Sequence, residues 1–491
     1  MPEKMHCTLE QEMDEIVHLT ASVYRPIWRQ TITQGTPVDR PYSLLAVQAV
    51  ADILAWNQDE NFAVSYIQKR DGLHLLVACD HTLSSSRVQF LENVRARLLE
   101  IAESMEEQDV DSNCGSEVAD LGHDLYRYIL NKCQQKSKHK FRKHWQIIKG
   151  FCEKYSRFEN EPQIYEYLGN RYLIEAFSRF SKYIVLGIVS PNKYDACFTS
   201  TMVLQQFLTA SDWIPRGGRS LEAIGRLARA MHFRGDIVHA LQEFMKHFQA
   251  INCLTRLALP CRRNFLETLR IVPICSPRLP SLQSHDFKLW RWLLNHWVPP
   301  HFMNELQRFK NFDLGKFPHR AEKVSNGHGS YHCDLLILDY LAKFRNSRPQ
   351  FKSRFPLSTT KPSCQACYEV LSCIDYINFG NQRNTPEYQW RRQPRTNGQM
   401  CVHGWRLPPG ILDDYQTTTL ISKYRDFLME GLNYAGRDST VRFRKYERHA
   451  IAIASRRHKN SNIQVIQIGF EHAKLYQYTQ EIDKITDLTA T

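Results

Sequence analysis

The chain has 491 residues, of which 43% are hydrophobic and 23% are charged, and its net charge is +13. This composition is typical of a soluble globular protein, and the length predicts two to four domains. No apolar run approaches the roughly 20 residues that span a bilayer, and the longest, Ile184 to Val189, is far too short.

The first residues, Met1 to Lys4, lack the basic and then apolar profile of a secretory signal. The 14 Cys residues are spread thinly along the chain, unlike those of a small disulfide-bonded scaffold. We therefore expect reduced thiols and a protein of the cytoplasm or nucleus, with no membrane association.

The N-terminal part of the chain changes from a helical to an extended pattern. Residues 8–58 have the apolar spacing of helices. Two apolar runs follow, Phe62 to Gln68 and Leu73 to Cys79, and the turn dipeptide Asp71-Gly72 separates them, which predicts a β-hairpin. Apolar residues then recur every three to four positions over residues 86–104, which predicts an amphipathic helix.

The middle of the chain has a helical pattern from about residue 117 to residue 256, after a polar loop at residues 105–116. The next segment, residues 257–285, contains four prolines. Because proline interrupts helices and strands, we expect a connector with little regular structure there.

The C-terminal part alternates helical and short extended segments. The pattern predicts helices that begin at His332 and near Cys367, with a short strand from Phe355 to Thr359 between them. It also predicts a long amphipathic helix over residues 413–432 and a strand over residues 463–468.

Two short motifs at these helix starts carry the residue types of a metal site. His332 and Asp334 begin the first helix, and Cys364 and Cys367 begin the second. One His and two Cys can hold a zinc ion and leave its fourth position open for water, as in a catalytic zinc site. A carboxylate two residues after the His is placed to move protons. We therefore interpret His332, Cys364 and Cys367 as zinc ligands and Asp334 as a catalytic acid/base.

Two other interpretations of the same cysteines stay open. Cys401 and His403 follow the Cys364 and Cys367 pair at a distance close to that of zinc fingers, so the four residues could form a closed structural site. The cysteines could also be small buried hydrophobic residues without a metal.

Together these patterns resemble the deaminase-like proteins expanded in fungi, relatives of the nucleic-acid and nucleotide deaminases that also occur as bacterial toxins. Zinc nucleobase deaminases share the pattern His-x-Glu followed by Pro-Cys-x-x-Cys. In this chain Asp334 takes the place of the Glu, and Ser363 stands where the pattern has Pro. The resemblance lies in four stretches: Phe62 to Ile101 with its Phe90-Leu91 pair, Tyr331 to Leu341, Thr360 to Cys364, and His403 to Pro408.

The resemblance implies an α/β fold, a three-layer α/β/α sheet of the deaminase type with N-terminal helices and a large all-helical insertion. It implies zinc on His332, Cys364 and Cys367, with Asp334 as the general acid/base. It also implies the matching activity, which is hydrolytic release of ammonia from a nucleobase, free or within nucleic acid.

This fold divides the chain into five expected parts, and the zinc motifs lie in the fourth. They are residues 1–60 (N-terminal helices), 61–104 (first strands and helix of the core), 105–320 (helical insertion and Pro-rich connector), 321–410 (the zinc-motif half of the core) and 411–491 (C-terminal helix and tail).

Two residues outside the ligand set are candidates for substrate binding. Asp80 ends the second predicted strand and could face a ribose or base, although an Asp at this place is also typical of the start of a loop. Trp405 could stack on a base, or it could be a buried core residue.

Positive charge is concentrated in residues 136–145, 391–395 and 442–459. Aromatic residues among Lys and Arg suit stacking on unpaired bases, so these segments are candidate nucleic-acid contacts. Such runs are also typical of a solvated helix face or loop.

Three hypotheses of function follow. The leading one is a zinc-dependent deaminase of a nucleobase. The second is a non-catalytic protein of the same fold, serving in interaction or nucleic-acid binding, and the third is a helical scaffold with a structural zinc. Convergence of His332 and the two Cys around an open position would argue against the third hypothesis.

Overall fold

The structure is a computed structural model of the chain. It describes residues 8–23, 42–57, 60–80, 83–108, 115–158, 168, 171–188, 190, 219–259, 262–277, 296–307, 331–346, 356–361, 363–380 and 405–436. All of these residues belong to one compact unit, Met1–Arg437. The predicted strand at residues 463–468 and most of the predicted C-terminal tail lie outside the described residues.

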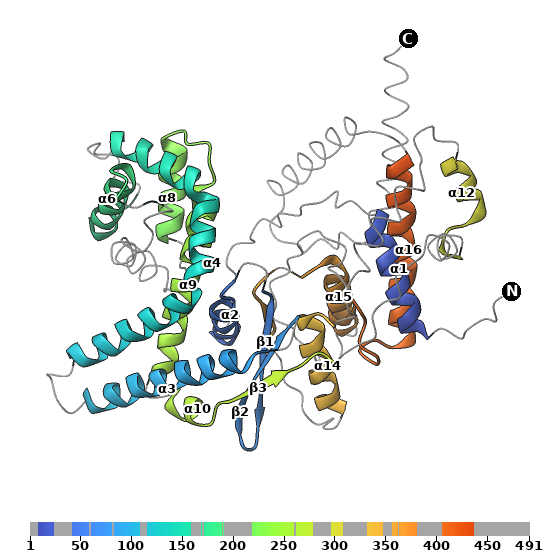
Figure 1. Ribbon diagram of the computed structural model, residues 1–491, viewed down its shortest axis with the longest axis horizontal. Coiled ribbons are helices and arrows are strands. Elements are labelled where there is room, and N and C mark those ends of the chain that lie inside the picture. Colours follow the sequence, from blue (N-terminus) through green and yellow to red (C-terminus); the bar gives the residue numbers. More distant parts are fainter. Residues whose placement is uncertain are drawn as a thin grey trace, which may run out of the picture. The chain divides into compact units, whose positions relative to one another are not determined.

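The described part of the chain is mostly helical, with four strands in one sheet (Figure 1). In chain order the elements are α1 (Leu9–Val23), α2 (Tyr42–Leu54), β1 (Phe62–Lys69), β2 (Gly72–Cys79), α3 (Ser85–Gln108), α4 (Gly115–Phe158), α6 (Arg171–Val185), α8 (Arg219–Ala230), α9 (Ile237–Thr255), η2 (Arg256–Ala258), α10 (Arg263–Glu267), β3 (Arg270–Ile274), α12 (Pro300–Gln307), α14 (Cys333–Asn346), β4 (Ser358–Thr359), α15 (Gln365–Gly380) and α16 (Asp414–Gly436).

The predicted hairpin is confirmed, with β1 and β2 antiparallel from the Phe62–Cys79 pair to the Lys69–Gly72 pair. Gly72 has φ +129°, a backbone conformation that L side chains rarely adopt. A Cβ at this position would also lie 2.4 Å from the carbonyl oxygen of Thr268. The turn therefore requires glycine for two reasons.

The sheet has the strand order β3-β2-β1-β4. β4 is antiparallel to β1, and it is the short strand predicted before Cys364. β3 is parallel to β2, and it lies in the Pro-rich segment, residues 257–285, that we expected to be a connector with little regular structure, so this expectation is wrong for residues 270–274. Pro273 is tolerated because β3 is at an edge of the sheet. An edge strand has a neighbour on one side only, so the missing N–H of proline need not break a hydrogen bond of the sheet.

Helices cover both faces of the sheet (Figure 1). Successive strand residues point to opposite faces. Val64 and Val77 lie in one buried cluster with residues of α2 and α3, whereas Ala63 and Leu76 lie in another with residues of α14. We call the second set of buried residues the α14/α15 cluster, and its members include Ala63, Leu76, Leu336, Leu338, Cys364, Cys367, Leu371, Trp405 and Tyr424. The described residues therefore form a mixed α/β fold around a four-stranded mixed sheet.

A second part of the unit is built from helices alone. α4, α6, α8 and α9 pack around a set of buried side chains that we call the helical cluster, which includes Phe141, Phe151, Tyr155, Phe177, Phe180, Ile224 and Phe244. Phe177 lies edge-on to Tyr155, with ring centroids 4.8 Å apart. The helical pattern predicted from residue 117 onward is confirmed for these helices. Among the described residues, no helix combines the length and apolar character needed to cross a membrane.

Candidate metal centre

The sheet brings together two helix starts that lie 32 residues apart in sequence. Asp80 directly follows β2, and its Oδ1 accepts a hydrogen bond of 2.9 Å from the backbone N–H of Cys333, the first residue of α14. Cys364 directly precedes α15, and its Sγ lies 3.5 Å from the backbone nitrogen of Cys367, which donates to it. His332 and Cys364 therefore both occupy positions where helix N–H groups and the helix dipole favour negative charge.

Three potential ligand atoms converge at this point. Nδ1 of His332 lies 3.3 Å from Sγ of Cys367 and 3.5 Å from Sγ of Cys364. All three residues are buried, and their ligand atoms lie within 4.8 Å of one another. Ligand atoms of a tetrahedral zinc ion are roughly 3.5–3.8 Å apart, given bond lengths of 2.0–2.3 Å. The three side chains therefore fit a metal ion of this size, as predicted from the sequence.

Without a metal ion, two of the three groups hold a proton that a cation would displace. Burial alone would raise the pKa of Cys364, but a hydrogen bond with Cys367 and the charge of His332 lower that pKa to about 6. Burial alone would lower the pKa of His332, but the Cys364 thiolate raises that pKa to about 10. Burial raises the pKa of Cys367 well above its usual value. A bound metal cation would take the place of the protons on His332 and Cys367.

Asp334 is buried in the first turn of α14. Its Oδ1 accepts a hydrogen bond of 3.1 Å from the backbone N–H of Leu335. Its charge acts on the pKa of His332 and on the pKa of both cysteines. The carboxylate therefore lies close enough to the three ligand groups to interact with them electrostatically.

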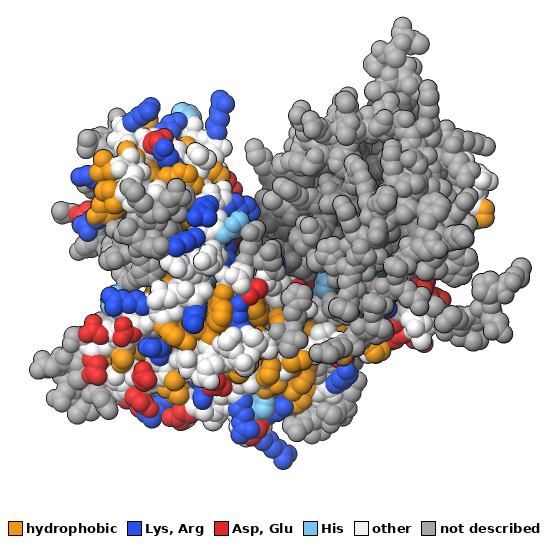
Figure 2. Space-filling view, viewed as in Figure 1, with side chains coloured by type: hydrophobic (Ala, Val, Ile, Leu, Met, Phe, Trp, Pro, Cys, Tyr) orange, Lys and Arg blue, Asp and Glu red, His pale blue; other side chains and the backbone are white. Residues whose placement is uncertain are grey.

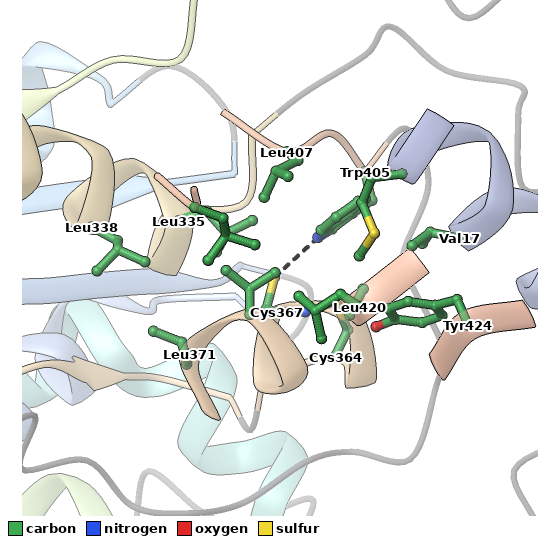
Figure 3. Packing of buried hydrophobic residues seen from close by; sticks show 14 of the residues in the cluster. Val17, Leu335, Leu338, Cys364, Cys367, Leu371, Trp405, Leu407, Leu420 and Tyr424 are labelled. Atoms are coloured by element: carbon green, nitrogen blue, oxygen red, sulfur yellow. Dashed lines mark hydrogen bonds between the residues drawn. The ribbon is translucent and has the colours of Figure 1, made fainter. Parts of the chain in front are cut away.

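Trp405 is fully buried, and its indole Nε1–H donates a hydrogen bond of 3.3 Å to Sγ of Cys367 (Figure 3). Such a bond stabilises a thiolate. Of the two interpretations of Trp405, the structure shows the buried core residue, and stacking on a base stays a prediction. The same holds for a substrate contact of Asp80, whose observed role is to accept the hydrogen bond at the start of α14.

Asp14 of α1 holds the segment that carries Trp405, and no sequence pattern pointed to this residue. Its Oδ1 accepts a hydrogen bond of 2.8 Å from the backbone N–H of Leu407, and its Oδ2 forms an ion pair of 2.9 Å with Arg406. Asp14 is itself buried. No local sequence signal marks it, because its partners lie more than 390 residues along the chain.

The alternative ligands and two of the three basic segments lie outside the residues that the structure describes. Cys401 and His403, the partners in the closed-site alternative, lie outside the described residues, as do the segments 391–395 and 442–459. The described basic segment, residues 136–145 of α4, is divided between the interior and the surface, since Lys136 is buried and Lys143 is exposed. On the face shown in Figure 2, Lys and Arg side chains are interspersed with acidic and hydrophobic ones.

Comparison of the chain with family models, with curated proteins and with solved structures gave no match.

Proposed function

We propose that the protein is a zinc-dependent deaminase of a nucleobase, with a three-layer α/β/α fold of the deaminase type. The observation that carries the proposal is the convergence of His332 Nδ1 with the sulfurs of Cys364 and Cys367 beside a buried carboxylate, Asp334. Helices on both faces of the mixed sheet support the proposed fold.

Zinc is the metal that this donor set favours. Thiolate and imidazole ligands select zinc over magnesium or calcium, which prefer oxygen. Three protein ligands are typical of catalytic zinc sites, whereas structural sites use four. When bound in such a site, zinc lowers the pKa of a water molecule to about 7 and so makes hydrolysis feasible at neutral pH.

In this proposal, Asp334 carries the proton between water and the leaving ammonia. Ammonia leaves readily only after the amino group of the base is protonated, so a nearby acid/base is needed. The hydrogen bond from Leu335 N–H fixes the orientation of this carboxylate. Trp405 and Asp80 do not touch the reacting atoms in this proposal: Trp405 stabilises the Cys367 thiolate, and Asp80 fixes the start of α14.

A second candidate is a non-catalytic protein in which the same zinc is structural. The observation that favours it is the depth of the site, because the three ligands, Asp334 and Trp405 are all buried. Asp334 is also one methylene shorter than the Glu of the deaminase pattern, and small misplacements of a catalytic group reduce rates strongly.

The test is metal analysis of the purified protein together with an ammonia-release screen over nucleosides, single-stranded DNA and RNA. We expect one zinc per chain and release from at least one substrate. Asp334→Asn should abolish release and keep the zinc, because Asp334 is not a ligand. Asp339→Asn is the matched control, since Asp339 lies on the same helix and pairs with Lys343 instead. Full activity of Asp334→Asn would refute the mechanism, and inactivity of both the native protein and Asp334→Glu would favour the non-catalytic candidate.

A further inference from the structure

A group of three lysines lies where α2, α4 and α9 pack together. Lys136 and Lys140 are one turn apart on α4, and Lys246 comes from α9. Ser137, next to Lys136 on α4, lies 2.8 Å from Nδ1 of His247, next to Lys246 on α9, so the three lysines lie near one another. The charge of Lys246 accordingly lowers the pKa of both α4 lysines. We call these three residues the lysine cluster.

The charges in this group do not balance. Lys140 pairs with Glu243 at 3.1 Å, and Lys246 pairs with Asp52 at 2.8 Å. Lys136 is only 7% exposed, and no ion pair of its own is seen among the described residues, although the charge of Asp52 acts to raise its pKa. Three lysines thus share two carboxylates, and a buried charge is costly unless an opposite charge is paired with it.

The surroundings of Lys136 supply further polar groups. Ser137 follows it on α4, and its hydroxyl lies 2.8 Å from Nδ1 of the buried His247 on α9. Lys246 also donates to the backbone oxygen of Thr360 at 3.4 Å. The interior at this place is therefore a polar junction of several elements, in contrast with the apolar packing on either side of it.

We propose that the lysine cluster binds a phosphate group, either inorganic phosphate or the terminal phosphate of a phosphate monoester. A phosphate group offers several acceptor oxygens, so it can accept from Lys136 while it also reaches the already paired Lys140 and Lys246. The exposed fraction of Lys136, 7%, favours a compact terminal phosphate over a continuous nucleic-acid backbone.

The low pKa of Lys136 agrees with this assignment. Burial is the largest cause, and Lys140 and Lys246 add to it, so that the pKa falls to about 7. A bound dianion would act in the opposite direction and keep the amine charged. None of the three lysines is a proposed metal ligand, so the inference does not depend on the proposed deaminase activity.

The experiment is calorimetric titration of the full chain with inorganic phosphate, a nucleoside monophosphate, the matching nucleoside and a short single-stranded DNA without terminal phosphates. Chloride at equal ionic strength is the baseline. We expect saturable binding of phosphate and of the monophosphate only. Lys136→Met should weaken that binding at least about tenfold, because it removes a hydrogen bond to a charged group. Lys143→Met, which changes an exposed lysine of the same helix, should bind as the native protein does.

A second measurement uses the unaltered protein and locates the site directly. Phosphate should protect Lys136, and not Lys143, from an amine-reactive label read by mass spectrometry. Three results would overturn the proposal: no binding above the chloride baseline, equal losses in Lys136→Met and Lys143→Met, or equal binding of the DNA that lacks terminal phosphates. In the first case Lys136 would be a buried neutral amine.

Discussion

The α14/α15 cluster and the helical cluster are both well buried, but their interiors are completed in different ways. The helical cluster is closed by aromatic and aliphatic packing, as in the edge-on contact of Tyr155 with Phe177. The α14/α15 cluster places an imidazole and two thiols side by side in its interior. Apolar packing alone fills the helical cluster, whereas the α14/α15 cluster contains donor atoms that can bind a cation.

This difference predicts that metal binding and folding are coupled on one side of the molecule only. A buried site of three ligands contributes its binding free energy to the stability of the residues that form it. The helices α4, α6, α8 and α9 contain none of the three ligands and should be stable without the metal.

The largest effect is expected for Cys364→Ser. Loss of one of three ligands should remove the zinc and with it much of a binding free energy on the order of 10 kcal/mol. Peptide-resolved hydrogen exchange should show faster exchange in α14 and α15 and little change in α6 and α8. Cys152→Ser, which changes a buried Cys of the helical cluster, is the control and should retain the metal. Uniform loss of protection in both clusters would contradict the comparison.

The next largest effect is expected for Phe177→Ala in the helical cluster. Phe177 is fully buried among Phe151, Tyr155 and Phe180, so the substitution leaves a cavity. We expect a loss of about 3–5 kcal/mol in the free energy of unfolding, measured with a denaturant. Zinc content should stay at the native level. A loss of zinc in this variant would show that the two clusters are not independent.

The two sides should also respond oppositely to pH. Burial raises the pKa of Asp14, in the α14/α15 cluster region, to about 7, against the hydrogen bonds from Leu407 and Arg406. A raised carboxyl pKa gives stability that is complete below the unfolded pKa near 4 and is lost as the pH rises through 7. The slope is at most about 1.4 kcal/mol per pH unit. Asp14→Asn should remove this slope in unfolding curves measured from pH 4 to 7, and an unchanged slope would contradict the assignment.

The smallest expected effect concerns Glu243, on the helical side. Burial alone would raise its pKa, but Lys140 and Lys246 lower the pKa to about 2. A lowered carboxyl pKa gives stability that is present above the unfolded pKa of 4.5 and is lost as the pH falls toward 2. The free energy of unfolding of Glu243→Gln should therefore depend less on pH than that of the native protein between pH 4.5 and 2. An identical acid limb would show that the ion pair with Lys140 contributes nothing.

The sequence predicted the features that depend on short patterns. The hairpin has two apolar runs around Asp71-Gly72, and the ligand set consists of residues that begin predicted helices. Both signals are local. The turn depends on a backbone conformation that glycine adopts, and the ligand residues lie at or next to the start of a helix.

The features that the sequence did not reveal depend on tertiary packing. β3 was missed because Pro273 indicates a break, while its place at a sheet edge removes the penalty. Asp14 and Leu407 meet only through the fold. Lys136 was assigned to a charged run, and burial of one face of α4 against α9 decides which lysines of that run face solvent.

The most direct test of the account is X-ray absorption at the zinc edge on the purified, full-length protein. We predict one zinc per chain with two sulfur neighbours at about 2.3 Å and two lighter neighbours near 2.0–2.1 Å. One lighter neighbour would be His332, and the other a solvent molecule at an open position. Three or four sulfur neighbours would establish a closed structural site, and absence of bound metal would remove the basis for the proposed deaminase.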